Sequence, residues 1–287
     1  MRLRYGLEYG QAVDERSRFV KNEALNRWRT ASYRLRDGGL TISVRHHPSP
    51  HGTPSNDLWV LKEIFLDGAY RVPAQISMPP APTIVDLGAN IGLFTAFMFG
   101  QYPAARVTAF EPDRENLSLL RESARRNGYG DHLVVHEACA MPRNGPVRFA
   151  TGEHQFSHVV DLPDPQAAEV PGMDVFPSLH GVDLLKIDIE GGEWRLLSDS
   201  RFGEPRAVVM EYHPMMCPST DPRALVKQLL TERGYEVVLD DEPMVWAVRA
   251  DELKRPTPGE RAVAGAYGAS SGGPTASDRR TGRLVSR

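Results

Sequence analysis

The amino-acid sequence predicts an α/β protein built on a mostly parallel sheet with helices on both faces. Two observations predict this fold. After Pro82, short apolar runs alternate with segments that have the apolar spacing of helices, and two final runs follow each other without a helix. The alternating runs are TIVDLG, RVTAFEP, HLVVHEACA, VDLLKIDIEG and RAVVMEYHP, and the final two are YEVVLDD and MVWAVRAD. We expect the final two to pair as an antiparallel hairpin at the sheet edge.

The helix-like segments between the runs share an apolar stripe that can cover a sheet. They are expected at Leu93–Tyr102, Arg114–Asn127, Glu193–Ser198 and Arg223–Arg233. In the first of these segments, Phe94, Phe97 and Met98 are expected to bury the helix against the sheet.

Residues 1–80 are predicted to form a helical lid ahead of the sheet. The segment Asp14–Arg36 is Arg-rich with spaced apolar residues, which predicts an amphipathic helix. A short strand at LTISV, a loop rich in Pro, His and Gly, and a helix capped by Asp57 are expected next. Trp59, Phe65 and Tyr70 are expected to pack within this region.

The α/β domain is predicted to span residues 81–254. Beyond it the composition changes to Pro, Gly, Ala, Ser, Thr and Arg, with few side chains that could be buried. We therefore expect residues 255–287 to be a disordered tail.

Composition narrows the class of protein. With 287 residues, 41% of them hydrophobic, the chain can form one sizeable core. A net charge of -3 argues against a nucleic-acid partner. The two cysteines are too few for a disulfide framework, and neither an apolar run of membrane-spanning length nor a signal peptide is evident. We expect a cytoplasmic protein without a membrane partner; its oligomeric state stays open.

The stretch VDLGANIG predicts a ligand-binding turn at the end of the first strand of the sheet. Gly88 and Gly92 allow a sharp turn, and the following helix offers its N-terminal N–H groups. The order Asp-x-Gly-x-Asn-x-Gly differs from the dinucleotide pattern G-x-G-x-x-G. Asp86 would repel a pyrophosphate but can accept a hydrogen bond from an ammonium group. Asp86, Gly88, Asn90 and Gly92 therefore predict a site for an amino-acid moiety.

Glu111 ends the next predicted strand, in AFEPDREN. A carboxylate at that edge of a parallel sheet is placed to accept hydrogen bonds from both hydroxyls of a ribose. An amino-acid moiety on the loop and a ribose on the neighbouring strand together predict S-adenosyl-L-methionine as the cofactor.

Four segments together resemble the FkbM family of S-adenosylmethionine-dependent methyltransferases: VDLGANIGLFT, AFEPDRENLSLLRESARRNG, DLLKIDIEGGEWRLL and MEYHP. The resemblance implies a seven-stranded, Rossmann-like methyltransferase sheet. It also implies O-methylation of a hydroxyl on a sugar, polyketide or other secondary metabolite, as in antibiotic biosynthesis. The loop GEHQFSH departs from the family pattern by its bulk and its histidines.

Charged residues at two further strand ends are candidates for catalysis. Lys186, Asp188 and Glu190 alternate with apolar residues, so we expect them on one side of their strand, with Asp188 also at the cofactor. His213 is our predicted general base because imidazole titrates near neutral pH, and Glu211 is expected to orient it. His154 and His158 are second-choice bases.

Several alternatives stay open at this level. His46, His47 and His51 have the composition of a weak metal site, and the acids around Asp188 could hold a divalent cation; we predict no metal because Lys186 already supplies compensating charge. Methylation of a carboxylate would need no base. A cofactor-binding protein without catalysis is a further possibility. The Asn/Asp-Pro-Pro-aromatic motif of nucleic-acid amino methylation is absent.

Overall fold

The structure is a computed structural model that describes residues 2–25, 29–47, 55–150, 158–159 and 167–253. The predicted tail at 255–287 and the histidines His51 and His154 lie outside the described residues.

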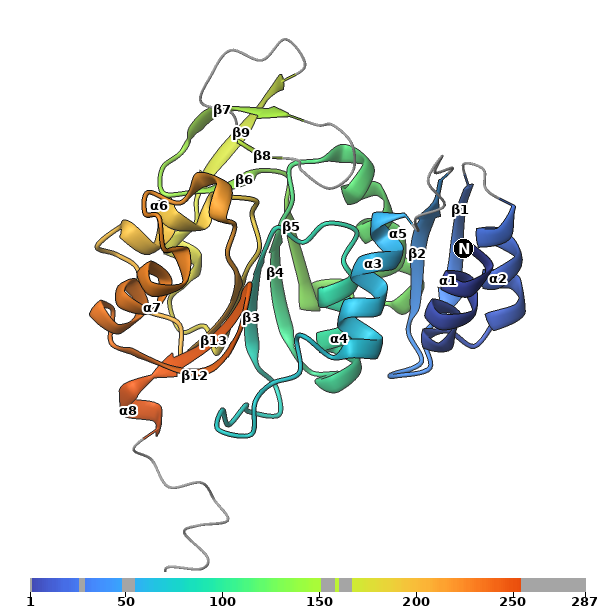
Figure 1. The fold of residues 1–287 in the computed structure, drawn as a ribbon, viewed down its shortest axis with the longest axis horizontal. Helices are drawn as coiled ribbons and strands as arrows, with labels where there is room; N and C mark the ends of the chain where they lie inside the picture. The colour runs from blue at the N-terminus through green and yellow to red at the C-terminus, as the bar shows by residue number, and fades with distance from the viewer. Residues whose placement is uncertain (1, 26–28, 48–54, 151–157, 160–166, 254–287) are drawn as a thin grey trace, which may run out of the picture. The chain divides into compact units, whose positions relative to one another are not determined.

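The described residues contain a seven-stranded sheet, which confirms the predicted fold class (Figure 1). The strand order is β12-β13-β11-β10-β3-β4-β5. The bounds are β3 (Thr83–Leu87), β4 (Arg106–Phe110), β5 (Leu133–His136), β10 (Leu184–Ile187), β11 (Ala207–Glu211), β12 (Tyr235–Asp241) and β13 (Met244–Arg249). Neighbours from β11 to β5 are parallel, whereas β13 is antiparallel to both β11 and β12. The predicted hairpin therefore closes one edge of the sheet.

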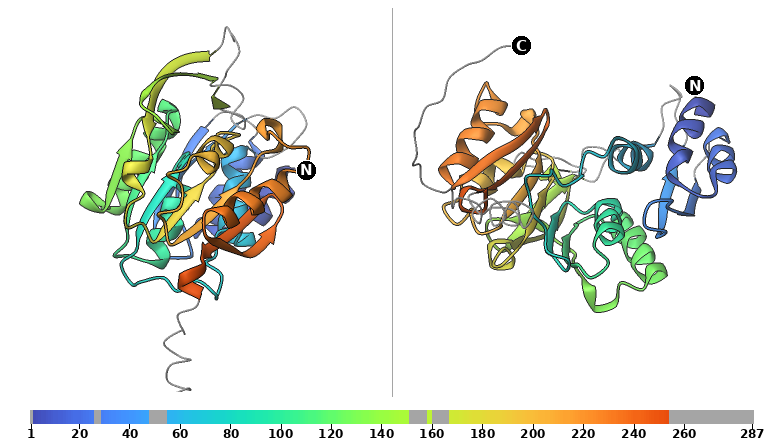
Figure 2. Two further views of the ribbon diagram at one scale, coloured as in Figure 1. Left: turned by 90° about the vertical axis from the view of Figure 1, so that its left-hand side faces the viewer. Right: turned by 90° about the horizontal axis from the view of Figure 1, so that it is seen from below.

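Helices cover both faces of this sheet (Figure 2). They are α4 (Leu93–Gln101), α5 (Arg114–Asn127), α6 (Glu193–Ser198), α7 (Pro222–Glu232) and a short α8 (Ala250–Leu253). Alternate strand residues enter two cores because successive side chains point to opposite faces. Ile84 and Leu184 join the core of α4, where Phe94, Phe97 and Met98 are buried as predicted. Val85 and Leu185 join the core beneath α6 and α7.

The strand order reverses between β3 and β10. From β3 the chain proceeds to β4 and β5 on one side and later returns to β10 and β11 on the other. In open α/β sheets, ligands bind at the carboxyl ends of the strands beside such a reversal. The loops after β3, β4 and β10 all begin at this edge.

A second, smaller sheet was not predicted. It contains β6 (Cys139–Met141), β7 (Gly145–Ala150), β8 (His158–Val159) and β9 (Ala167–Asp174), in the order β6-β9-β7-β8. The run HLVVHEACA, predicted as one strand, divides into β5 of the main sheet and β6 of this small sheet. Figure 1 shows the small sheet beyond the upper ends of the main strands.

The N-terminal region contains a hairpin where a helix was expected. Its elements are α1 (Arg2–Tyr9), α2 (Arg16–Ala24), β1 (Arg29–Arg34), β2 (Thr41–His46), α3 (Asn56–Lys62) and a π-helical turn at Glu63–Asp67. The predicted helix Asp14–Arg36 is wrong beyond Ala24, because Ala31 and Tyr33 are buried at a spacing of two and pair with β2.

Two details of this region also differ from expectation. Ser55 occupies the N-cap position of α3, and Asp57 instead accepts hydrogen bonds from Arg45. Trp59 packs against Tyr5 and Tyr9 of this region as expected but is 44% exposed, and Tyr70 is buried as expected.

Strand β2 joins the N-terminal region to α5. The side chain of Asn127 accepts a hydrogen bond from the N–H of Thr41 at 2.7 Å and donates one to its carbonyl at 2.7 Å. Figure 1 shows β2 between α5 and β1. Across the described ranges, none of the helices combines the length and apolar composition needed to cross a bilayer.

Candidate active site

The loop after β3 turns through backbone conformations that favour glycine. Gly88 and Gly92 have φ of 77° and 84°, and Asn90 has φ of 50°. The N–H groups of Gly88 and Ala89 both donate to the carbonyl of Phe110, which fastens the loop to the end of β4. A Cβ on Gly88 would lie 1.8 Å from the carbonyl oxygen of Asp188. The first glycine is therefore required both by its conformation and by the close approach of the loop after β10.

Glu111 is held at the end of β4 by three donors. Its Oε2 accepts from the N–H of Asn90 at 2.7 Å, and its Oε1 accepts from the N–H of Asp113 at 2.9 Å and from Asn116 Nδ2 at 3.2 Å. Burial raises the pKa of Glu111 to about 7, although these three hydrogen bonds each act to lower it. The carboxylate is thus oriented by the backbone of both loops before any ligand arrives.

Asp86 is fully buried at the end of β3, beside charged and polar side chains of the protein. Asp86 and Lys186 are register partners on β3 and β10, and both are buried. Asp86 Oδ1 lies 3.4 Å from Lys186 Nζ, and Asp86 Oδ2 accepts a hydrogen bond from Thr95 Oγ1 at 2.8 Å. The ammonium group of Lys186 therefore lies beside this carboxylate, and the contact of Asp86 with an ammonium group of a ligand stays a prediction.

Lys186 links the two loops that follow its strand and β3. Its Nζ donates to the carbonyls of Gly88 at 2.7 Å and Leu87 at 3.3 Å, and lies 3.4 Å from Asp188 Oδ2. Burial alone would lower the pKa of Lys186, but Asp188 and Asp86 together raise it. Lys186 is therefore a charged strut beneath the site.

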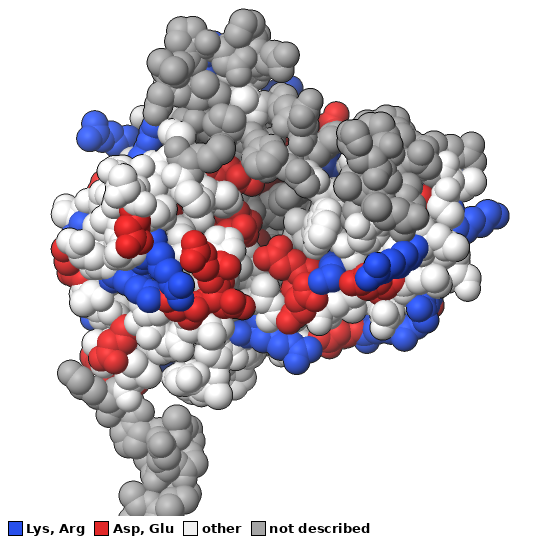
Figure 3. Space-filling model, viewed as in Figure 1, with Lys and Arg blue, Asp and Glu red and all other residues white. Residues whose placement is uncertain are grey.

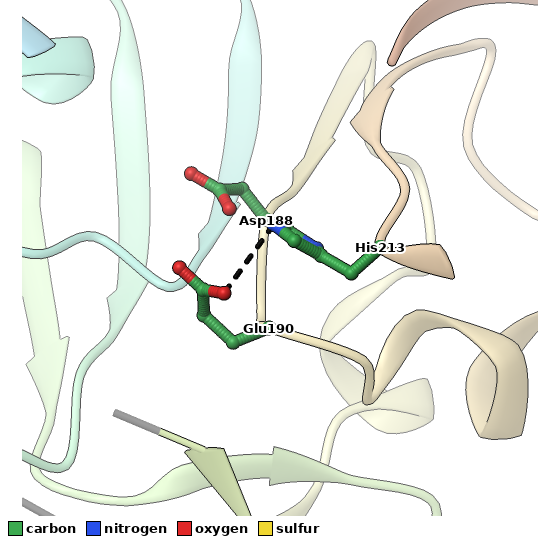
Figure 4. Close-up of side chains that lie close together, drawn as sticks. All are labelled: Asp188, Glu190 and His213. Carbon is green, nitrogen blue, oxygen red and sulfur yellow. Dashed lines mark ion pairs between the residues drawn. The ribbon is translucent and has the colours of Figure 1, made fainter. Parts of the chain in front are cut away.

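Asp188, Glu190 and His213 come together above this strut (Figure 4). Ligand atoms of the three side chains all lie within 4.8 Å of one another. Strand β10 ends at Ile187, so the predicted alternation does not reach Glu190, which instead lies in a turn with φ of 50°. His213 Nε2 is 3.4 Å from Glu190 Oε2, and its Nδ1 is 3.1 Å from Glu193 Oε1. The buried Glu193 also accepts the N–H of His213 at 2.5 Å.

The surroundings of His213 bear on its predicted role as general base. Burial alone would lower its pKa, but the hydrogen bond with Glu193 and the charges of Glu193, Asp188 and Glu190 raise it to about 9. These neighbours therefore favour the imidazolium near neutral pH in the free protein. The role of general base stays a prediction for His213 and requires its neutral form.

Two carboxylates beside His213 titrate close to neutral pH. Burial raises the pKa of Glu190 to about 7, partly opposed by the charge of His213. Burial, then the charges of Asp188 and Glu63, raise the pKa of Glu211 to about 8. Figure 3 shows acidic side chains gathered across the middle of the molecular surface in the view of Figure 1.

One cavity joins the ends of β3, β4 and β10 to the small sheet. Of the predicted residues, Gly88, Asn90, Glu111, Asp188 and Glu190 line it, whereas Asp86, Gly92, Lys186 and His213 are not part of its lining. The sequence analysis missed wall residues from four other segments: Asn116 of α5, Cys139 and Met141 of β6, Phe149 of β7, and Met216. Asn116 carried a detectable signal, because it lies one turn into the helix that follows Glu111.

The same groups have the chemistry of a divalent-cation site, since two carboxylates and an imidazole converge in Asp188, Glu190 and His213. Each of these groups already has a charged partner among the described residues: Asp188 pairs with Lys186, and Glu190 pairs with His213. Among the N-terminal histidines, His46 is buried between Tyr33 and Glu23 and serves packing.

A glycine loop at the reversal of a parallel sheet, followed by an oriented acid on the next strand, lies where open α/β sheets bind their ligands. The description "Methyltransferase FkbM domain" belongs to the family model that matches residues 86–237, more than half of the chain. The chain belongs to the FkbM methyltransferase family.

The chain is also similar to individual methyltransferases. The chain is 30% identical over 212 residues to Methyltransferase 1 of Beauveria bassiana, covering 63% of this chain and 82% of that protein. It is 26% identical over 227 residues to the 31-O-demethyl-FK506 methyltransferase FkbM of Streptomyces tacrolimicus, covering 65% and 84%. The crystal structure of methyltransferase FkbM from Methylobacillus flagellatus superposes with a TM-score of 0.46 at 21% identity, covering 62% of this chain and 46% of that one.

Gly88→Ala should lower the free energy of unfolding by more than about 3 kcal/mol, because it adds a steric clash to a left-handed backbone. Gly128→Ala is the matched control: its φ is 65°, but nothing lies within 4 Å of the added Cβ. It should cost only about 1 kcal/mol. Urea unfolding of both variants measures the difference, and equal losses would show that the loops after β3 and β10 do not approach this closely.

Proposed function

We propose that this protein is an S-adenosylmethionine-dependent O-methyltransferase that acts on a hydroxyl of a small molecule. The observation that carries the proposal is the position of Glu111, an oriented, buried carboxylate lining the same cavity as Gly88, Asn90 and Asp188. Membership of the FkbM family supports methyl transfer, and the residues that line the cavity support S-adenosylmethionine as the cofactor.

The residues present fit S-adenosylmethionine. The Glu111 carboxylate can accept hydrogen bonds from ribose hydroxyls. The apolar walls for the adenine ring of the cofactor are provided by Phe110, Cys139 and Phe149. Asp188 and Glu190 add negative charge to the cavity, which favours a cationic ligand. When bound, the cofactor supplies an electrophilic methyl group on a positively charged sulfur.

We propose Glu190 as the general base. It lines the cavity, and its pKa of about 7 suits acceptance of a hydroxyl proton near neutral pH. His213 is then a positioning residue: its imidazolium is anchored by Glu193 and approaches Glu190 from the side. Asp188 remains at the border between cofactor and acceptor, and Lys186 holds Asp188 and the glycine loop in place.

The acceptor class rests on the relatives and on the cavity. The name of the Streptomyces relative specifies an O-demethyl acceptor. Met141, Phe149 and Met216 give the cavity an apolar portion that suits a secondary metabolite with a hydrophobic surface. The alternatives are a carboxylate acceptor, which needs no base, and cofactor binding without catalysis.

Isothermal titration of S-adenosylmethionine into the purified protein tests cofactor binding. We expect micromolar binding, weakened about 10- to 100-fold in Glu111→Gln because a neutral amide accepts weaker hydrogen bonds from the ribose. Glu232→Gln, an exposed change on α7, should bind like the wild type. A wild-type protein that ignores millimolar cofactor would contradict the proposal. Incubation with a metabolite extract should then yield a product heavier by one methyl group, which separates turnover from binding.

The pH dependence of kcat/KM tests the proposed base. Because the deprotonated carboxylate is the active form, kcat/KM should rise as pH increases through the pKa of Glu190 in the free protein, about 7. Glu190→Gln should lower kcat about 100-fold or more. His213→Gln removes a positive charge that lowers this pKa, so the rise should move to higher pH. An unchanged rate and profile in Glu190→Gln would favour the carboxylate acceptor.

A further inference from the structure

A chain of charged and polar side chains runs from the N-terminal region to Glu111. Arg45, in β2, donates to both oxygens of Asp57: Nη2 to Oδ1 at 2.9 Å and Nε to Oδ2 at 3.0 Å. Asp57 Oδ2 also accepts the backbone N–H of Arg45 at 2.7 Å. The guanidinium is thereby fixed in a two-point ion pair with a buried carboxylate.

The Nη2 group that pairs with Asp57 also reaches α5, because it carries two hydrogens. Arg45 Nη2 donates to Asn116 Oδ1 at 2.7 Å, and Asn116 Nδ2 in turn donates to Glu111 Oε1 at 3.2 Å. Arg45 lies outside the segment that matches the FkbM domain, whereas Asn116 and Glu111 lie inside it. Two regions far apart in sequence therefore meet at one carboxylate.

The chemistry of these groups fixes the orientation of the amide. A guanidinium can only donate, so the oxygen of Asn116 must face Arg45 and its NH₂ group must face Glu111. Rotating the amide would place its oxygen against the carboxylate and its NH₂ group against the guanidinium, so both contacts would become repulsive. Lysine could not replace arginine here, because a point charge lacks the planar fork that binds both oxygens of Asp57 while its Nη2 also donates to Asn116.

We propose that Arg45 is a positioning residue for the cofactor site: held by Asp57, it orients Asn116, and Asn116 orients the Glu111 carboxylate that receives the ribose. The hairpin and α3 are then part of cofactor recognition as well as a packing layer. This inference rests on the proposed S-adenosylmethionine site.

The test compares cofactor affinities in a double-mutant cycle. Arg45→Gln is combined with Asp57→Asn, so that no buried charge is left without a partner. We expect this double change to weaken S-adenosylmethionine binding about fivefold to tenfold. In a Glu111→Gln background the same double change should alter the affinity for S-adenosylmethionine by less than about twofold, because the Glu111 carboxylate that it orients is no longer present. A merely structural role would give the same loss in both backgrounds.

The matched control removes an ion pair elsewhere. Arg223→Gln with Asp240→Asn deletes the pair between α7 and β12, at the sheet edge opposite β5, and should leave cofactor binding unchanged. Asn116→Leu is the second variant: it breaks the same connection while leaving Arg45 and Asp57 paired, and should weaken binding to a similar degree.

The outcomes separate this inference from the proposed function. Binding within twofold of the wild type in both the Arg45 and Asn116 variants, or equal losses with and without Glu111, would overturn the positioning role. A wild-type protein that does not bind the cofactor would overturn the proposed function instead. In that case the same double-mutant cycle is measured as free energies of unfolding in urea without ligand. Coupling between Arg45 and Glu111 supports the positioning role, and additive losses refute it.

Discussion

The buried ammonium group of Lys186 joins two parallel strands at the point where the strand order reverses, and the rest of the site depends on it. Its partners are Asp86 below, Asp188 above and the carbonyls of Leu87 and Gly88 beside it. A buried charge costs several kcal/mol unless it is paired and hydrogen-bonded. The three charged side chains are therefore interdependent, and together they hold the glycine loop against the loop after β10.

Negative charge is in excess above this strut. Asp188, Glu190, Glu193 and Glu211 lie near His213, and Lys186 is already shared with Asp86. Burial is the main cause of the raised pKa values of Glu190 and Glu211, and repulsion by the charge of Asp188 raises both further. A cationic ligand relieves that repulsion, whereas the uncharged thioether left after methyl transfer does not. The same electrostatics would thus favour binding of the cofactor and release of its product.

The sequence was informative where local pattern and strand position agree. The main sheet, the edge hairpin, the turn at Gly88 and the strand end at Glu111 were all predicted, because apolar periodicity and glycine spacing are local signals. The ion pair of Asp86 was not predicted because its partner, Lys186, lies a hundred residues away and only strand register brings the two together. The pKa of His213 could not be predicted because it depends on Glu193 and Glu190, which no local pattern reveals. The small sheet was missed because β7 and β9 carry Gly and Pro, and because β6 and β8 have only three and two residues.

The central claim is that the loops after β3, β4 and β10 form one crevice for a sulfonium nucleoside, with Glu111 at its ribose end. A crystal structure of the protein with S-adenosylhomocysteine tests it most directly. We predict the ribose hydroxyls within hydrogen-bonding distance of the Glu111 carboxylate and the amino-acid portion beside Gly88. A nucleoside bound elsewhere, or a ribose that avoids Glu111, would contradict the account.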